Sequence, residues 1–261
     1  MLREGAIEDI FDGKYYSPED LVPVGCRDCE GCSDCCRNTG DTIILDPYDM
    51  YLLCAGTGKS FQDMIEKEIE IRLVDGIILP NLMQHHDRKE KTADRSGRPS
   101  AEGDIRSEEK DLEKEQETPL KTEDRTEDCC PFLSDAGRCT IHSFRPGLCR
   151  LYPMGRYYTE EGFRYILQKD ECTDRPKTPV LLQDWLGIED LPRYEAFVLV
   201  WHDFKKELQR AVPALTQRSR DSVLRYVLQI FFVHPYLTKQ DFYPQFKVRM
   251  ETCREALREI L

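Results

Sequence analysis

The sequence lacks the hydrophobic segments that target a protein for export or hold it in a membrane. Its first residues, MLREGAIEDIFDGKYY, contain no apolar segment of the signal-peptide kind. No later stretch reaches the roughly 18 uninterrupted apolar residues that a membrane helix requires. We therefore expect a cytoplasmic protein without a membrane span.

Positively charged residues are fewer than negatively charged ones. The chain has 37 Lys and Arg residues against 49 Asp and Glu residues, which gives a formal net charge of −12. A general grip on nucleic acid or on an anionic membrane requires a basic face. We therefore expect no nucleic-acid partner.

The common catalytic motifs are missing as well. The sequence contains no GxGxxG or Walker-type phosphate loop, no HExxH and no nucleophile elbow. A methyl-donor site of the Rossmann type, with its glycine-rich turn after a strand, is not visible either. The catalytic residues are therefore unknown at this stage.

Cysteine, in contrast, is abundant. The chain has 12 cysteines, and the reducing cytosol favours metal ligation over disulfides. The densest run is Cys26-x2-Cys29-x2-Cys32-x2-Cys35-Cys36, whose two-residue gaps direct pairs of sulfurs at one metal position. Adjacent side chains of an extended chain point to opposite sides, so we expect Cys35 and Cys36 to serve two metal positions.

A second group of cysteines follows near the middle of the chain. It comprises Cys129, Cys130, Cys139, Cys149 and Cys172. These thiols supply the distant ligands that would close a pair of four-coordinate sites, so that folding and metal binding become linked.

Several residues near these groups are expected to have ordinary structural roles. Cys54 and Cys253 fall on apolar helical stripes, where a free cysteine is usually a small core residue. His142 is either a ligand or a structural histidine, and the second is favoured. We expect His85 and His86 to be solvent-exposed. Arg145 and Pro146 either turn the chain toward Cys149 or shape a pocket near the metal.

The predicted architecture is α+β and helix-dominated: an irregular cysteine-rich metal-binding module with short hairpins, packed with a C-terminal helical bundle. The module divides into residues 1–86 and 129–176. The segment 87–128 is highly charged and has no aromatic residue, which predicts a solvated insertion, disordered or partly helical. The alternative is a charged docking arm for a partner. Residues 177–261 form the helical region.

Periodicity places individual elements. Asp46 and Pro47 predict the start of a short helix that ends at Gly56 or Gly58, and Ser60 predicts a second helix over about 61–74. GIILPNLM predicts a strand, and turn signals predict hairpins around 134–137 and 159–162. Thr178 and Pro179 predict the start of the helical region. Three apolar stripes then follow: Leu191, Tyr194, Phe197, Val198, Trp201, Phe204 and Leu208; Val223, Leu224, Val227, Leu228 and Phe231; and Phe242, Phe246, Met250, Cys253, Leu257 and Ile260.

The order of the motifs resembles a known family. Cys29-x2-Cys32-x2-Cys35-Cys36 is followed by ILDPYDMYLL, then CPFL, then Cys139 with Ile141, and then RPGLCRLYP. This order is similar to that of the CxxCxxCC cysteine-cluster family, described as a zinc- or iron-chelating domain. Flagellin lysine N-methylases resemble the same group. The resemblance extends from about Cys26 to Cys172.

The resemblance implies a set of metal ligands, sufficient for two tetrahedral zinc ions or two iron–sulfur clusters. They are Cys29, Cys32, Cys35, Cys36, Cys130, Cys139, Cys149 and Cys172. Cys26 and Cys129 are additional to the family pattern and leave the assignment open to exchange, and we keep Cys26 as a ninth candidate. Only analogy with the family suggests S-adenosylmethionine as a further cofactor.

We favour iron–sulfur over zinc as the metal. The thiols crowd together as in ferredoxins, and the chain has only five histidines. A zinc tetrathiolate and an oxidised four-iron cluster with four thiolates both carry a charge of about −2. Four arginines near the cysteines are expected to offset this charge: Arg37, Arg138, Arg145 and Arg150.

Three functions agree with this interpretation. The first is a metal-binding protein whose cysteine sites stabilise the module and whose helices present a surface to a partner protein or complete a pocket. The second is a metal-dependent enzyme, for which the resemblance suggests methylation of a lysine in a protein substrate. The third is a redox or metal sensor. The oligomeric state is left open.

Overall fold

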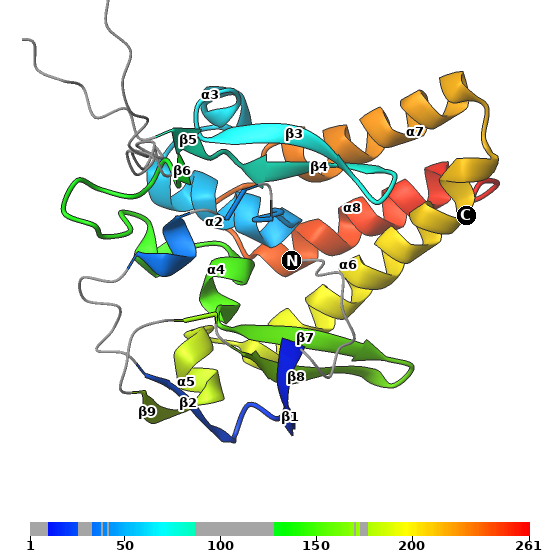
Figure 1. Ribbon diagram of the computed structural model, residues 1–261. Helices are drawn as coiled ribbons and strands as arrows, with labels where there is room; N and C mark the ends of the chain where they lie inside the picture. The colour runs from blue at the N-terminus through cyan, green and yellow to red at the C-terminus, as the bar shows by residue number, and fades with distance from the viewer. Residues whose placement is uncertain are drawn as a thin grey trace, which may run out of the picture.

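The structure, a computed structural model, describes residues 10–25, 33–37, 39–40, 42–86, 128–169, 171–172 and 177–261. Cys26, Cys29 and Cys32 of the cysteine run, and residues 87–127 of the expected insertion, lie outside the described residues. The fold is mixed, with helices, small sheets and a C-terminal helical segment (Figure 1). The predicted fold class is thereby confirmed.

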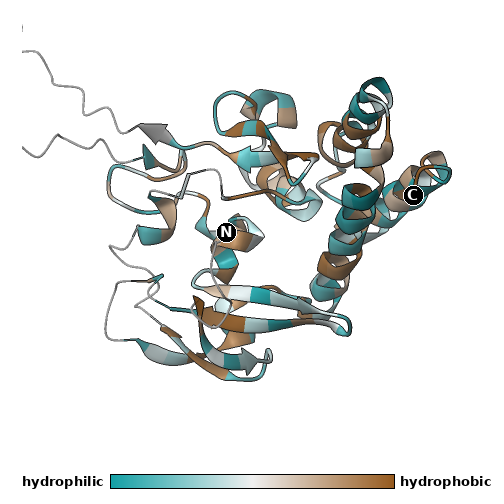
Figure 2. Ribbon diagram, turned by 45° about the vertical axis from the view of Figure 1, so that its right-hand side comes forward, coloured by the Kyte–Doolittle hydropathy of each residue, from teal (hydrophilic) through white to brown (hydrophobic). Residues whose placement is uncertain are grey.

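The C-terminal helices bury one face each, as their stripes predict. They are α6 (Leu191–Ala211), α7 (Gln217–Leu228) with the π-helical turn η5 (Gln229–Val233), and α8 (Phe242–Ala256), while a short 3-10 turn, η4 (Val212–Ala214), follows α6. All seven stripe residues of α6 are buried. Hydrophobic and hydrophilic bands alternate along these helices in Figure 2, as expected of helices with one face in the core.

Four small antiparallel sheets make up the β structure. One has the strand order β1-β8-β7, and the others are the pairs β2-β9, β3-β4 and β5-β6. Their bounds are β1 Phe11–Tyr16, β2 Leu21–Gly25, β3 Ile69–Val74, β4 Ile77–Leu82, β5 His85–His86, β6 Asp128–Cys129, β7 Met154–Thr159, β8 Gly162–Gln168 and β9 Thr178–Leu181. The predicted strand at GIILPNLM is β4, and the predicted hairpin around 159–162 is β7-β8.

The helix predicted after the cysteine run is α2 (Pro47–Thr57). Its N-cap is Asp46, whose side chain accepts from the Asp49 N–H, while the Asp49 side chain accepts from the Asp46 N–H. This reciprocal pair satisfies two backbone donors that the first turn of a helix leaves free. The helix ends at Gly58, which has a left-handed φ of 70° that suits glycine.

Two helix predictions are wrong. The helix expected over 61–74 is only α3 (Phe61–Met64), and the remainder is the turn at Glu66 and the strand β3. The sequence of β3 is rich in β-branched residues and pairs along its full length with β4, so tertiary pairing outweighs a weak helical pattern. Likewise Thr178 and Pro179 lie in β9, which pairs with β2, and the helix α5 (Leu182–Leu186) begins after them.

One continuous hydrophobic core joins the halves of the chain. It includes Val22 of β2, Met50 of α2, Leu82 of β4 and Phe231 of η5. In Figure 1, α2 lies between the β3-β4 hairpin and the short helix α4 (Gly147–Leu151). This position lets α2 support the segments that carry the cysteines. In the described part of the chain, no helix combines the length and the apolar character needed to cross a membrane.

Candidate metal centre

Two cysteines of the N-terminal run are held by the 3-10 turn η2 (Asp34–Cys36). The Cys36 N–H donates to the Ser33 carbonyl at 2.8 Å, and the sulfur atoms of Cys35 and Cys36 lie 3.9 Å apart. Successive side chains of a 3-10 helix are about 120° apart rather than on opposite sides. The expectation that adjacent cysteines point to opposite sides is therefore wrong, because the chain is not extended here.

The second cysteine group comes to η2 through backbone pairing. The Cys130 N–H donates to the Cys36 carbonyl at 2.8 Å. A turn over 134–137 then leads back to Cys139, which pairs with Leu133 by a single antiparallel bridge. The predicted hairpin is thus a turn closed by one bridge, and it carries Cys139 back toward Cys130.

Cys149 reaches the same region on α4. This helix begins at Gly147, whose N–H donates to the Asp49 Oδ1 atom of α2 at 2.7 Å. A further 3-10 turn, η3 (His142–Phe144), packs against α2 through Phe144, which lies over Gly56. The loop between Cys139 and Cys149 is therefore fixed to α2 at two points.

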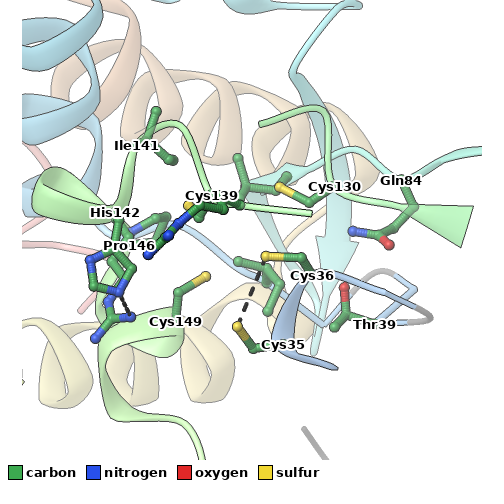
Figure 3. Close-up of a pocket in the computed structure, with 14 residues that line it drawn as sticks. Cys35, Cys36, Thr39, Gln84, Cys130, Cys139, Ile141, His142, Pro146 and Cys149 are labelled. Atoms are coloured by element: carbon green, nitrogen blue, oxygen red, sulfur yellow. Dashed lines mark hydrogen bonds between the residues drawn. The ribbon is translucent and has the colours of Figure 1, made fainter. Parts of the chain in front are cut away.

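These elements place five thiols around one cavity of about 240 Å³. The thiols belong to Cys35, Cys36, Cys130, Cys139 and Cys149, and Figure 3 shows them around the same space. Residues far apart in the sequence thus meet, as the two cysteine groups led us to expect. Thr39 and Gln84 also line the cavity, and no motif in the sequence singled them out.

Proximity changes the acidity of the thiols. Hydrogen bonding to Cys36, burial and the neighbouring thiols raise the pKa of Cys35, and hydrogen bonds to Cys130 and Cys139 raise the pKa of Cys36. Burial raises the pKa of Cys149. The hydrogen bond from Cys36, aided by the Ile141 backbone and by Arg145, lowers the pKa of Cys139 to about 7 although burial opposes it. A bound cation would relieve the repulsion between such thiolates.

Arg145 supplies positive charge at the cavity wall. Its side chain is 9% exposed, and its Nη1 atom is 2.7 Å from His142 Nε2. Its Nε atom is buried without a hydrogen-bond partner among the described residues. An unpaired buried donor is costly, so this guanidinium suits an anionic metal–thiolate centre. Of the other arginines expected near the ligands, Arg138 lines the cavity, while Arg150 donates to the carbonyls of Ser143 and Arg145.

The remaining candidate cysteines lie elsewhere. Cys172 is not among the residues that line the cavity, and its sulfur accepts from Lys177 Nζ at 2.6 Å. Cys129 lies in β6, which pairs with β5 at His85 and His86. Cys253 is fully buried in the core, and Cys54 packs against the core, as their stripes indicate. All nine described cysteines are free thiols.

The donor set fits a soft metal. Five convergent thiols are the ligands that zinc and iron–sulfur clusters prefer. Within the ranges that the structure describes, no three His, Cys, Asp or Glu side chains have the geometry of a complete metal site as they stand. The thiols instead line one cavity, in which a bound group would lie.

Comparison with known proteins agrees with this chemistry. Residues 81–177 match the CxxCxxCC family, described as a putative zinc- or iron-chelating domain. The matched residues include Cys130, Cys139 and Cys149 of the cavity, together with Cys129 and Cys172. The match begins after the N-terminal cysteine run. Neither the curated proteins nor the solved structures gave a match. The resemblance to flagellin lysine N-methylases is therefore not shown.

Proposed function

We propose that this protein binds metal as an iron–sulfur cluster in the five-thiol cavity. Cys35, Cys36, Cys130, Cys139 and Cys149 supply the ligands, of which a four-iron cluster needs four. The single observation that carries this proposal is the convergence of five thiols from three separate segments on one cavity. The match of residues 81–177 to the CxxCxxCC family supports it.

The size of the thiol-lined cavity favours a cluster over a single zinc ion. A mononuclear zinc site draws its four sulfurs to about 2.3 Å from one ion and leaves no void between them. Here the five thiols line a cavity of about 240 Å³, space in which a polynuclear centre can lie. A cluster held there would supply electron-transfer or Lewis-acid chemistry.

Zinc is the second candidate because of one distance. The sulfurs of Cys35 and Cys36 are 3.9 Å apart, and a tetrahedral zinc tetrathiolate has an edge of about 3.8 Å, as follows from the zinc–sulfur distance. Two ligands of a zinc ion could therefore come from these neighbours with little movement. Cys26, Cys29, Cys32 and Cys172 are then the candidates for a second site.

Alanine variants test which thiols hold the metal. We expect Cys36→Ala and Cys139→Ala to lose most of the bound metal, because each removes a ligand at the centre of the thiol group. Cys54→Ala is the matched control, since this thiol packs against the core away from the cavity lining. Metal per chain is measured on protein purified without oxygen. Equal metal content in all three variants and the wild type would refute the proposed ligands.

A further inference from the structure

A second and larger cavity lies on the other side of α4. Its volume is about 610 Å³, and it is lined by the start of α2, the β3-β4 hairpin, β7 and α6. Gly147 and Leu148 of α4 line this cavity, whereas Cys149 of the same helix lines the thiol cavity. The two cavities are therefore neighbours that share a helix as a wall.

Of the three acidic residues that line this second cavity, Asp75 is exposed, whereas Asp46 and Asp49 have backbone partners. Asp46 Oδ1 accepts from the Asp49 N–H, and Asp49 accepts from the N–H groups of Asp46 and Gly147. Both carboxylates thus hold α2 and α4 in place. A ligand is not needed to satisfy them.

The basic groups lack direct ion pairs, although Asp46 attracts both Arg156 and Lys205, Asp49 attracts Arg156, and Asp75 attracts Lys205 from beyond salt-bridge distance. Arg156 Nη2 donates to the Tyr194 hydroxyl at 3.1 Å, and its Nε atom is buried without an acceptor among the described residues. No carboxylate in the described part of the chain forms a salt bridge with Arg156 or with Lys205. Burial lowers the pKa of Lys205, which indicates that its ammonium is only partly compensated by its surroundings.

A cation that is partly withdrawn from water and forms no direct ion pair is energetically unfavourable. Transfer of a charge from water to a protein interior costs several kcal/mol unless a counter-charge and hydrogen bonds replace the water. Two such cations face one cavity here. An oxyanion between them would accept from the Arg156 guanidinium and from the Lys205 ammonium, as guanidinium–carboxylate and guanidinium–phosphate pairs do.

The rest of the wall is largely apolar and aromatic. Trp201 and Val198 line it from α6, Leu45 lines it from the segment before α2, and Tyr158 of β7 stacks on His202 with ring centroids 3.7 Å apart. Pockets that combine an apolar wall with a few placed charges are typical of sites for small organic molecules.

We propose that this second cavity binds a small organic anion, with its carboxylate or phosphate group held by Arg156 and Lys205 and its apolar body against Trp201 and Val198. The ligand would lie across α4 from the thiol cluster. The anion site rests on this cavity, on the Arg156 Nε atom without an acceptor and on two cations without a direct ion pair among the described residues, and it stands whether or not the thiols hold a metal.

Tryptophan fluorescence provides the test. The chain has two tryptophans, so Trp185→Phe leaves Trp201 in the cavity wall as the only reporter. This variant of the full chain, as purified, is titrated at constant ionic strength with benzoate and, separately, with phenyl phosphate. Benzyl alcohol is the neutral control. We expect a saturable signal from at least one anion and none from the alcohol, and the preferred anion identifies the oxyanion group.

Substitutions of charged residues, made in the Trp185→Phe protein, test which side chains bind the anion. We expect Arg156→Gln and Lys205→Met each to weaken anion binding about tenfold or more, as loss of a charge-assisted hydrogen bond predicts. Lys247→Met, which changes an exposed lysine on α8, should leave the affinity unchanged. If Arg156→Gln does not fold by circular dichroism, Lys205→Met decides. The proposal is overturned if neither anion gives saturation, if the alcohol binds equally, or if folded charge variants keep wild-type affinity.

Discussion

Gly147 is the point where α2, α4 and α6 meet, and its substitution tests the packing that separates the two cavities. A Cβ atom at this position would overlap the Tyr194 hydroxyl, and it would lie 3.6 Å from Asp49 Oδ1. Gly147 also donates its N–H to that carboxylate. Gly147→Ala should therefore displace α4, the helix that carries Cys149.

The expected cost follows from this overlap. Forcing one extra methyl group into a packed site destabilises a protein by about 1–3 kcal/mol. The better helix propensity of alanine offsets at most about 1 kcal/mol of this loss. We expect the free energy of unfolding to fall by about 1–2 kcal/mol and the metal content to fall with it. Gly155→Ala is the control, because its Cβ would meet only side-chain atoms, those of Ile166 at 3.2 Å and Gln168 at 3.6 Å.

Tyr194→Phe sharpens the test, because it removes the oxygen that the new methyl group would meet. On its own it costs about 1–2 kcal/mol through the lost hydrogen bond from Arg156. In the double variant with Gly147→Ala, the new Cβ atom at position 147 would meet the ring Cζ atom at position 194 at 3.7 Å, which is an ordinary contact. The double variant should then be more stable than the sum of the single effects by about 1 kcal/mol.

Urea unfolding of the four proteins in this cycle, followed by circular dichroism, measures the coupling. Metal per chain, measured on the same samples, reports on the position of α4. Strictly additive effects, or a Gly147→Ala variant as stable as the wild type, would refute the packing described for α4 and Tyr194.

Three further outcomes are expected. In metal-free protein near neutral pH, iodoacetamide should alkylate Cys139 before Cys35, Cys36 or Cys149, because the pKa of Cys139 is lowered to about 7 and the pKa values of the other three are raised. The rate at Cys139 should fall as the pH drops below about 7, where its thiolate is protonated, and mass spectrometry that finds one of the other three thiols modified first would contradict this order. Removal of the metal should speed hydrogen exchange in residues 129–151 while α6 stays protected, because the thiol loop loses its cross-link, and unchanged exchange in that loop would argue against a metal there. Arg249→Met should lower the free energy of unfolding by about 2 kcal/mol, because Arg249 donates to the carbonyls at positions 230, 234 and 235 and lies over the Tyr236 ring. Lys247→Met is the control, and equal stability of these two variants in urea would refute the role of Arg249.

Periodicity made the C-terminal helices predictable. In α6 the apolar residues recur every three or four positions, and a one-sided stripe of this length is typical of a helix with one face in a core. Capping chemistry likewise located the start of α2 through Asp46 and Pro47, and it placed the end at Gly56 or Gly58, of which Gly58 is the C-cap. Such signals are local, so the sequence carries them directly.

The errors have physical causes that are not local. Residues 69–74 form a strand because β4 is available to pair with them, and Thr178 is extended because β2 lies beside it. The geometry of Cys35 and Cys36 depends on a 3-10 turn that spacing alone does not indicate. Pairing partners and turn type decide each case.

The candidate site was partly predictable. Cysteine spacing identified Cys35 and Cys36, and the family resemblance implied Cys130, Cys139 and Cys149. The structure brings these five residues to one cavity. The second cavity was not anticipated, because it forms only when α2, β7 and α6 meet. A single arginine in a strand and a single lysine beside an apolar stripe give no signal before these elements are assembled.

The most direct test of the thiol-ligated metal centre is the content of iron, zinc and acid-labile sulfide in the wild-type protein, purified without oxygen. We predict iron with a similar amount of sulfide and a broad visible absorption band, as an iron–sulfur cluster gives. Zinc without sulfide would replace the cluster by a tetrathiolate site. Protein that contains neither metal, with all thiols free, would contradict the account.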